Sequence, residues 1–188
     1  DPASVLAFIE NHDTDRFLGE GNNLPMLKQA STLLLTTRRI PQLYYGTEVM
    51  MNGVKSKSDG YVRKDFPGGW TGDATNALTP AGRTKIQNEC YDFYKTILNW
   101  RKGNDVIAKG SMVQFMVQNG VYAYARQYEG KTIFVMLNGT DAETTVPLKF
   151  YKEILKDSKQ GKDILSGKAI TFGEELKMGP RESLVIEL

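Results

Sequence analysis

The sequence predicts a protein in two parts, an α/β part with parallel strands followed by an all-β antiparallel part. Up to about Gly103, apolar runs alternate with helical patterns, which is typical of a parallel sheet with crossover helices. Beyond Gly103, short β segments and turn signals follow one another at regular spacing, which is typical of a β-sandwich. The 188 residues are 40% hydrophobic and 24% charged, an ordinary composition for globular domains. We place the boundary between residues 1–104 and 105–188.

Two strands and one helix are expected in the first half of the α/β part. Val5–Ile9 is a continuous apolar run, as expected for a strand that is covered on both faces. Asn23 offers an N-cap and Pro25 stands near the first helical position, so the pattern predicts a helix over 24–36. A second strand is expected over 40–46, with its proline tolerated at the beginning.

A long loop and a second helix complete the α/β part. Residues 47–78 are rich in Gly, Asp, Ser and Asn without a clear period, and loops of this length are usually functional. Thr79 and Pro80 then offer a cap and a first-turn proline for a long helix that Gly103 would end. The apolar stripe of this helix follows helical spacing and comprises Ile86, Cys90, Phe93, Ile97 and Trp100.

The all-β part is predicted from short apolar runs separated by Asn-Gly and Glu-Gly pairs. The expected strands cover 111–117, 121–127, 132–137, 143–148, 169–172 and 183–188. Turns are expected at Asn119-Gly120, Glu129-Gly130 and Asn138-Gly139; the last also matches a glycosylation sequon, but a tight turn explains it better. The expected core of this part comprises Val113, Phe115, Tyr122, Tyr124, Ile133, Val135 and Val185.

Charge and composition exclude several classes of function. Lys plus Arg number 24 and Asp plus Glu 22, so a formal charge of +2 gives no field to attract nucleic acid or anionic lipid. No apolar run approaches the ~20 residues of a membrane span. One His and one Cys are too few for a zinc site, and we expect no metal and no cofactor. Cys90 lies on a helical apolar stripe, which favours a core role over a nucleophile.

Other catalytic and binding motifs are absent or misplaced. No Gly-x-Ser-x-Gly elbow is present, and no glycines have dinucleotide-loop spacing. Gly130-Lys131-Thr132 mimics the end of a phosphate loop but falls in an expected hairpin turn. The chain opens at Asp1 without a basic leader or an initiator Met, so we expect it to be a piece of a longer protein.

The most informative cluster is residues 8–16, which holds the single His of the chain directly after a predicted strand. Loops at the carboxyl ends of parallel strands build the sites of α/β proteins. His12 and Asp13 are suited to hydrogen-bond sugar hydroxyls, or to act as a base and its orienting partner. A capped turn in which Asp13 and Asp15 accept from backbone N–H groups explains the same residues equally well.

Three segments carry a resemblance to a known family. Residues 8–13 (Phe-Ile-Glu-Asn-His-Asp) resemble the fourth signature region of the α-amylase family of glycoside hydrolases. Residues 39–48 resemble the signature around the eighth barrel strand of that family, with Arg39 in place of the usual glycine. Residues 60–70 resemble the eighth loop of the neopullulanase and cyclomaltodextrinase branch. The resemblance implies the last two strand–helix units of a (β/α)₈ barrel, followed by a carboxy-terminal β-sandwich.

The resemblance implies a part of a retaining glycoside hydrolase that acts on starch, maltooligosaccharides, pullulan or cyclodextrins. Asp13 matches the carboxylate that stabilises the transition state, and His12 matches a residue that hydrogen-bonds the same sugar. Asn11 fits the motif as a sugar contact or only shapes the turn. The nucleophile and the acid of the family lie on earlier strands, and neither signature is present, so the chain alone is expected to be inactive. The alternative is a non-catalytic structural or sugar-binding module.

Further sugar contacts are expected from the long loop and its surroundings. Arg16 either pairs with Asp13 or Asp15 or reaches a neighbouring subsite. Arg63 and Asp65 either contact sugar or form an ion pair that braces the loop. The remaining candidates are aromatic residues on which sugars stack, with buried packing as the alternative, namely Tyr45 and Trp70.

The expected partners follow from the same resemblance. We expect an α-glucan oligosaccharide as ligand, and neither nucleic acid nor membrane. Two strands of a barrel have unpaired edges and an uncovered apolar face, so self-association through that edge is expected. For a bacterial starch-degrading enzyme, a periplasmic or extracellular location is favoured over the cytoplasm.

Overall fold

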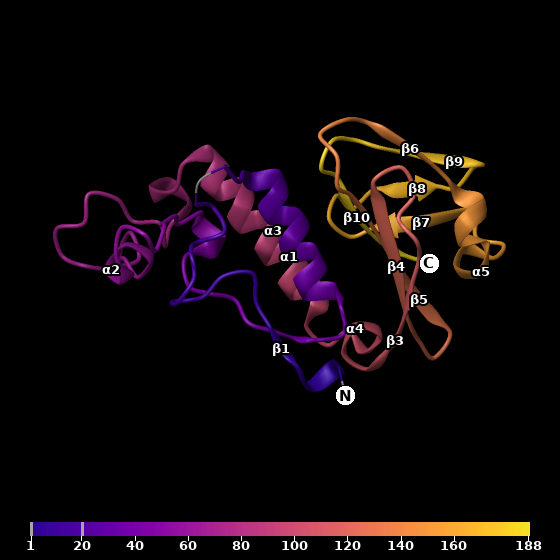
Figure 1. The fold of residues 1–188 in the computed structure, drawn as a ribbon, viewed down its shortest axis with the longest axis horizontal. Coiled ribbons are helices and arrows are strands. Elements are labelled where there is room, and N and C mark those ends of the chain that lie inside the picture. The colour runs from indigo at the N-terminus through magenta and orange to yellow at the C-terminus, as the bar shows by residue number, and fades with distance from the viewer. Residues whose placement is uncertain (1, 20) are drawn as a thin grey trace.

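The computed structural model describes residues 2–19 and 21–188, which form a helical part and a β-rich part packed side by side (Figure 1). Two long helices, α1 (Leu24–Thr36) and α3 (Lys85–Arg101), lie against each other in the middle of the molecule. Loops and short helices from residues 42–83 extend to one side of them, and the antiparallel sheets lie on the other side. Among the described residues, no helix is long and apolar enough to cross a bilayer.

The helix α1 has the predicted bounds because its start is encoded locally. The Asn23 side chain accepts a hydrogen bond from the Met26 N–H group, and Pro25 occupies the first turn, where its missing N–H group costs nothing. The α1 face toward the molecule buries Leu27, Leu34 and Leu35.

The start of α3 differs from the prediction. Thr79 caps only a short 3₁₀ helix, η3 (Pro80–Gly82), and α3 begins after Thr84, which forms a reciprocal capping box with Gln87. Its buried side chains are Cys90, Tyr94 and Ile97, and Ile86 at the expected head of the stripe is exposed. Gly103 follows the helix with a positive φ, as expected, and a short helix α4 (Asp105–Lys109), which was not predicted, begins after the Asn104 cap.

The two strands of the helical part pair in parallel, but they are shorter than predicted. β1 (Leu6–Ala7) and β2 (Ile40–Pro41) have two residues each, with Leu6 opposite Ile40. They are also not covered on both faces, because Val5, Leu6, Phe8 and Ile40 expose 52%, 53%, 43% and 50% of their surface. A parallel strand is buried when other elements surround it on both sides. Among the described residues, each of these two strands pairs with one other strand. The predicted loop of residues 47–78 contains two short helices, η2 (Thr47–Val49) and α2 (Asp59–Val62).

The β-rich part consists of a six-stranded antiparallel sheet and a two-stranded one. The large sheet has the order β3 (Ser111–Gln114), β4 (Val121–Tyr128), β5 (Lys131–Asn138), β10 (Ser183–Glu187), β7 (Gln160–Asp163) and β8 (Ala169–Thr171). The small sheet pairs β6 (Thr144–Pro147) with β9 (Glu175–Met178), and η4 (Leu148–Tyr151) and α5 (Lys152–Leu155) follow β6. All six predicted strands are present. β7 and β9 were not predicted, since Gln-Gly-Lys-Asp and Glu-Leu-Lys-Met hold few apolar residues.

The turn predictions are confirmed at two of the three sites. Asn119-Gly120 and Glu129-Gly130 both adopt left-handed backbone, which suits two-residue hairpin turns. Gly130 therefore lies in a hairpin turn, and Lys131 and Thr132 begin β5. Asn138 is different: it is buried at the end of β5, and its Nδ2 donates to the carbonyl oxygens of Ala142 and Gly179 at 2.9 and 2.8 Å. The expected tight turn at Asn138-Gly139 is wrong, and the side chain instead organises the loop that follows.

The large sheet buries both of its faces, and this divides the predicted core. One face packs against the small sheet, η4 and α5, through residues that include Ala123, Phe134 and Ile186. The other face packs against α1, α3 and α4. Of the predicted core residues, Val113 and Phe115 lie on the first face, whereas the others lie on the helix-facing side: Tyr122, Tyr124, Ile133, Val135 and Val185. The expectation of a single core in the sandwich was wrong. Successive residues of a strand point to opposite faces, and the register pairs Val113 with Ala125 rather than with Tyr124.

Candidate functional site

The exposed end of the helical part carries a cluster of four charged or polar side chains. The Asp13 carboxylate lies 3.1 Å from His12 Nε2 through one oxygen and 3.0 Å from Arg63 Nη2 through the other. Arg63 Nη2 also lies 3.2 Å from Asp59, and Arg63 Nε donates to the His12 carbonyl oxygen at 2.9 Å. The side chains of His12 and Asp13 are 58% and 57% exposed, so both remain accessible. The structure therefore brings together the predicted Asp13, His12 and Arg63.

The loop that presents His12 and Asp13 is shaped by hydrogen bonds within the loop and by hydrogen bonds to Lys55. Asn11 Oδ1 accepts from the Asp13 N–H group at 2.8 Å, and Thr14 Oγ1 accepts from the Asn11 N–H group at 3.0 Å. Asp15 accepts from the N–H group of Lys55, and Lys55 Nζ donates to the Asp13 carbonyl oxygen at 2.9 Å. The Asp15 carboxylate thus binds a backbone N–H group of a distant segment rather than of its own turn, and the Asp13 carboxylate faces His12 and Arg63. Asn11 is placed to shape the turn.

Arg16 lies in the interior, beneath this loop. Its partner is Glu10, at 3.2 Å, and both side chains are at most 2% exposed. The predicted pairing with Asp13 or Asp15 is wrong. Arg16 also donates to the Tyr45 and Val62 carbonyl oxygens at 2.7 and 3.1 Å. The structure therefore places Arg16 away from the exposed cluster.

The other predicted sugar contacts are exposed and lie on separate segments. Tyr45 is 41% exposed, and its hydroxyl donates to the Lys64 carbonyl oxygen at 2.7 Å, next to Arg63. Trp70 is 69% exposed, and its backbone N–H group donates a hydrogen bond to the Asp73 side chain in the same turn. Asp65 is exposed two residues beyond Arg63. Buried packing was the alternative to sugar stacking for these two aromatic residues, and it does not describe Trp70.

Two residues of this region were missed from the sequence. Asp59 is four residues before Arg63 on α2, and the i,i+4 spacing of opposite charges was the available signal. Glu10 stands inside the recognised motif, but nothing local indicates that its carboxylate accepts from Arg16 and from the Thr47 hydroxyl. The contact with Thr47 joins Glu10 to a segment 37 residues away.

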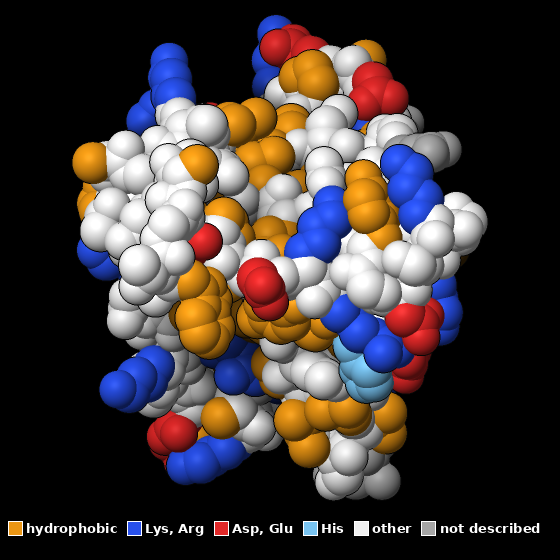
Figure 2. Space-filling view, turned by 90° about the vertical axis from the view of Figure 1, so that its left-hand side faces the viewer, with side chains coloured by type: hydrophobic (Ala, Val, Ile, Leu, Met, Phe, Trp, Pro, Cys, Tyr) orange, Lys and Arg blue, Asp and Glu red, His pale blue; other side chains and the backbone are white. Residues whose placement is uncertain are grey.

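Together with Lys55, the charged residues of the exposed cluster have balanced charges. Asp13 and Asp59 face Arg63, and Lys55 Nζ lies 3.8 Å from Asp59. Figure 2 looks onto this end of the molecule and shows the histidine in pale blue at the surface beside Lys or Arg side chains in blue. A charge-balanced set of donors and acceptors suits a neutral polyhydroxyl ligand better than an ion. Among residues 2–19 and 21–188, no three His, Cys, Asp or Glu side chains lie together so as to hold a metal ion.

Cys90 contributes no nucleophile to this site. It is fully buried, with its Sγ 3.6 Å from the Thr47 carbonyl oxygen, and burial raises the pKa of its thiol to about 12. Since the thiolate is the reactive form, a buried thiol with such a pKa is inert at neutral pH.

Comparisons with known proteins show that the chain is similar to α-amylases and cyclomaltodextrin glucanotransferases. Residues 112–187 match the model of the cyclo-malto-dextrinase C-terminal domain. The chain is 30% identical to an α-amylase of Niallia circulans over 89% of its length and 31% identical to a cyclomaltodextrin glucanotransferase of Thermoanaerobacterium thermosulfurigenes over 85%. It spans 29% and 21% of the lengths of these two relatives.

Solved structures agree on the fold. An Anoxybacillus α-amylase superposes with a TM-score of 0.77 at 20% identity, and the match covers 99% of this chain and 38% of that one. The α-amylase of Geobacillus thermoleovorans superposes with a TM-score of 0.75 at 23% identity, covering 99% and 39%. The chain is thus a relative of the carboxy-terminal part of α-amylase-family enzymes, and its residues 112–187 match the cyclo-malto-dextrinase C-terminal domain.

Proposed function

We propose that the chain is the carboxy-terminal part of a retaining glycoside hydrolase that acts on α-glucans. Residues 1–104 are assigned to the end of its (β/α)₈ barrel and residues 105–188 to the sandwich domain behind it. Two features support the barrel assignment: the parallel pairing of β1 with β2, and the long helix that follows each strand. In such a barrel the site forms at the carboxyl ends of the strands, where the loops after β1 and β2 carry Asp13, His12, Tyr45 and Arg63.

The observation that carries the proposal is the Asp13 carboxylate, exposed and held between His12 and Arg63. A carboxylate in this position supplies negative charge beside the oxocarbenium-like transition state of glycoside hydrolysis. His12 Nε2 and the Arg63 guanidinium are placed to hydrogen-bond hydroxyls of the same sugar. Tyr45 and Trp70 offer exposed aromatic faces on which further sugar rings stack.

The proposed substrates are starch, maltooligosaccharides, pullulan or cyclodextrins. The charge-balanced cluster fits these neutral sugars, and the curated relatives include an α-amylase and cyclomaltodextrin glucanotransferases. The resemblance of residues 60–70 to the neopullulanase branch supports a hydrolase of that group. We assign the longer protein to the periplasm or the extracellular space, because polymeric α-glucans do not cross membranes; cell fractionation tests this.

The decisive experiment compares the longer protein with its Asp13→Asn variant. The variant is expected to fold normally and to lose several hundred-fold in kcat, since a transition-state interaction of about 3–4 kcal/mol corresponds to that factor. The matched control is Asp141→Asn, which removes an exposed carboxylate that pairs with Arg181 on the β-rich part. Near-normal kcat in Asp13→Asn would refute the assignment of this residue.

The 188-residue chain alone is proposed to be inactive and to act at most as a sugar-binding module. Retaining hydrolysis needs a nucleophile and an acid roughly 5 Å apart, and the signatures that carry them in the family do not occur in this sequence. The exposed Trp70 and the His12–Asp13–Arg63 cluster favour residual sugar binding. Reducing-sugar release by the chain from starch, pullulan or cyclodextrin would disprove inactivity, and calorimetric titration with maltoheptaose tests binding.

A further inference from the structure

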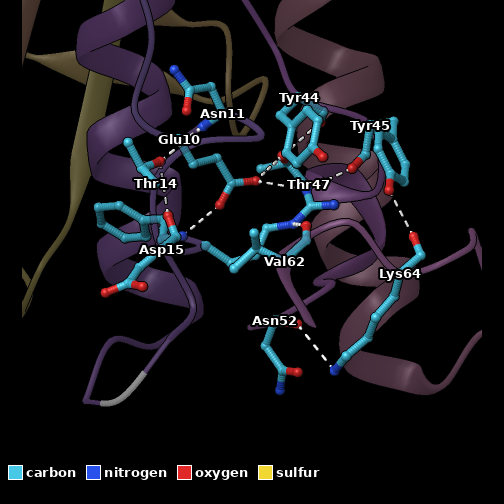
Figure 3. Close-up of polar contacts among 12 residues, drawn as sticks. Glu10, Asn11, Thr14, Asp15, Tyr44, Tyr45, Thr47, Asn52, Val62 and Lys64 are labelled. Atoms are coloured by element: carbon cyan, nitrogen blue, oxygen red, sulfur yellow. Dashed lines mark hydrogen bonds and ion pairs between the residues drawn. The ribbon is translucent and has the colours of Figure 1, made fainter. Parts of the chain in front are cut away.

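A buried ion pair lies directly beneath the exposed cluster. Glu10 and Arg16 approach to 3.2 Å with side chains 2% and 0% exposed, and the Arg16 guanidinium lies 3.8 Å from the centre of the Tyr44 ring. Glu10 also accepts from the Thr47 hydroxyl and from the Phe17 N–H group. Figure 3 shows Glu10, from the loop after β1, beside Tyr44 and Thr47, from the segment after β2.

Stability alone does not explain the pair. Moving two charges out of water costs several kcal/mol per ion, and well-packed apolar side chains of similar volume are often as stabilising. Here one Arg16 nitrogen, Nη2, is buried without a hydrogen-bond partner among the described residues, so the desolvation is incompletely compensated. What charged groups offer over apolar ones is direction, because each hydrogen bond fixes an angle as well as a distance.

The bonds of the pair end next to the residues of the exposed cluster. Arg16 donates to the carbonyl oxygens of Tyr45, itself a site residue, and of Val62, which precedes Arg63. Its backbone N–H group donates to the carbonyl oxygen of Gly53, two residues before Lys55. Glu10 stands two residues before His12 in the chain. The segments that carry His12, Tyr45, Lys55 and Arg63 are thus each fixed within two residues of the named residue.

We propose that Glu10 and Arg16 are positioning residues that set the placement of Asp13 relative to His12 and Arg63; this rests on the proposed function of that cluster. The cluster itself is exposed and comes from two loops, so its 3.0 and 3.1 Å contacts depend on how those loops are anchored. Sites of this kind need placement within about 0.5 Å, and a misplacement of 1 Å costs about a hundredfold in rate.

The test uses Glu10→Gln, which keeps the shape and removes the charge, and Thr47→Val, which removes a single hydroxyl donor to Glu10. Amide hydrogen exchange of Asp13 and Lys55 reports on the loop, and the ring resonances of His12 report on the cluster without overlap because the chain has one His. We expect exchange at both amides to rise about tenfold in Glu10→Gln, with a displaced or broadened His12 signal, and a smaller change of the same kind in Thr47→Val.

The matched control is Arg126→Met, which removes another buried guanidinium, one that binds carbonyl groups near the β-rich part. It should lower the melting temperature but leave the Asp13 and Lys55 amides within about twofold of wild type, because exposed loops exchange through local openings. Unchanged loop exchange and an unchanged His12 signal in Glu10→Gln would overturn the proposal. So would equal changes in Arg126→Met. If Glu10→Gln fails to fold, Thr47→Val and Arg16→Lys decide the question by the same readouts.

Sugar binding separates this proposal from the proposed function. We expect maltoheptaose affinity to fall about tenfold or more in Glu10→Gln and to be restored in part by Glu10→Asp. If the wild-type chain binds no maltoheptaose, sugar binding by the isolated cluster fails, while the exchange and His12 measurements still decide positioning. If the wild type binds and Glu10→Gln binds equally well, the positioning role is refuted and the proposed function stands.

Discussion

Arg126 Nη1 donates a hydrogen bond of 2.9 Å to the carbonyl oxygen of Thr36, 90 residues away at the end of α1. The same fully buried guanidinium donates to the carbonyl oxygens of Ile107 and Gly110, each at 2.8 Å, and of Ser111 at 3.1 Å. Burial lowers the pKa of Arg126, but guanidinium pKa values lie so far above neutrality that the group stays charged. A side chain on β4 thereby joins α1, α4 and β3, with carbonyl groups as its only partners among the described contacts.

Replacement of Arg126 is expected to be strongly destabilising. Arg126→Met keeps much of the apolar stem but leaves four carbonyl groups without their charged donor, so we expect a loss of about 3 kcal/mol or more. For a chain of this size that corresponds to a decrease of roughly 6–12 °C in melting temperature. Denaturant unfolding measures it against Lys109→Met, an exposed cation on α4, which should change stability by less than about 0.5 kcal/mol. Equal stability of the two variants would contradict this role.

His12→Ala is expected to reduce turnover by the longer protein less severely than Asp13→Asn. In the proposed site the imidazole hydrogen-bonds sugar, whereas Asp13 supplies a charge beside the developing cation. A loss of about 1.5–2 kcal/mol for His12→Ala corresponds to roughly 10–30-fold in kcat. Steady-state kinetics on a maltooligosaccharide measures both variants. A larger loss for His12→Ala than for Asp13→Asn would mean that the two roles are exchanged.

Self-association is expected through the exposed residues of β1 and β2. Val5, Leu6, Phe8 and Ile40 form an apolar group beside two strands whose outer edges are unpaired among the described residues. Leu6→Glu should lower the mean molar mass seen by light scattering at high concentration. Met116→Glu, which changes a side chain that is 82% exposed on the β-rich part, should have little effect. A wild-type chain that stays monomeric and binds little hydrophobic dye would contradict the expectation.

Cys90 is expected to resist thiol reagents until the chain unfolds. Burial raises the pKa of its thiol to about 12 from the ordinary value of about 9, so almost no thiolate forms in the folded chain at pH 8. The raised pKa means that the unfolded chain releases this proton first. Its contribution to stability is therefore complete below about pH 9 and is lost as the pH rises from about 9 to about 12. Urea denaturation of wild type and Cys90→Ala at pH 8 and pH 10.5 tests this: the wild type should lose more stability between the two.

The shared core makes the two parts of the chain interdependent. Tyr124 and Val135 lie opposite each other on β4 and β5 and face helices α1, α3 and α4, where the Tyr124 hydroxyl is hydrogen-bonded to Thr36. The β-rich part therefore does not bury its apolar surface by itself. Separation of residues 105–188 from the helices would expose this face to water.

The sequence by itself determined the features that depend on neighbours in the chain. Asn23 and Pro25 specify the start of α1, and the left-handed turn at Asn119-Gly120 joins two strands that were expected from their apolar runs. The motif around His12 and Asp13 was also recognisable, because it is a contiguous stretch of the sequence. In each case the hydrogen bonds involved close within a few residues.

Only the tertiary structure decided features that depend on distant partners. Val113 and Tyr124 were expected in one core, yet the register of β3 with β4 and the approach of the helices place them on opposite faces. Arg16 was expected either to pair with an aspartate near it in the loop or to reach a neighbouring subsite. It turns inward to Glu10 instead, and residues 45 and 62 supply its remaining acceptors. Burial and ion pairing are decided by which surfaces meet in space, and local sequence patterns do not carry that information.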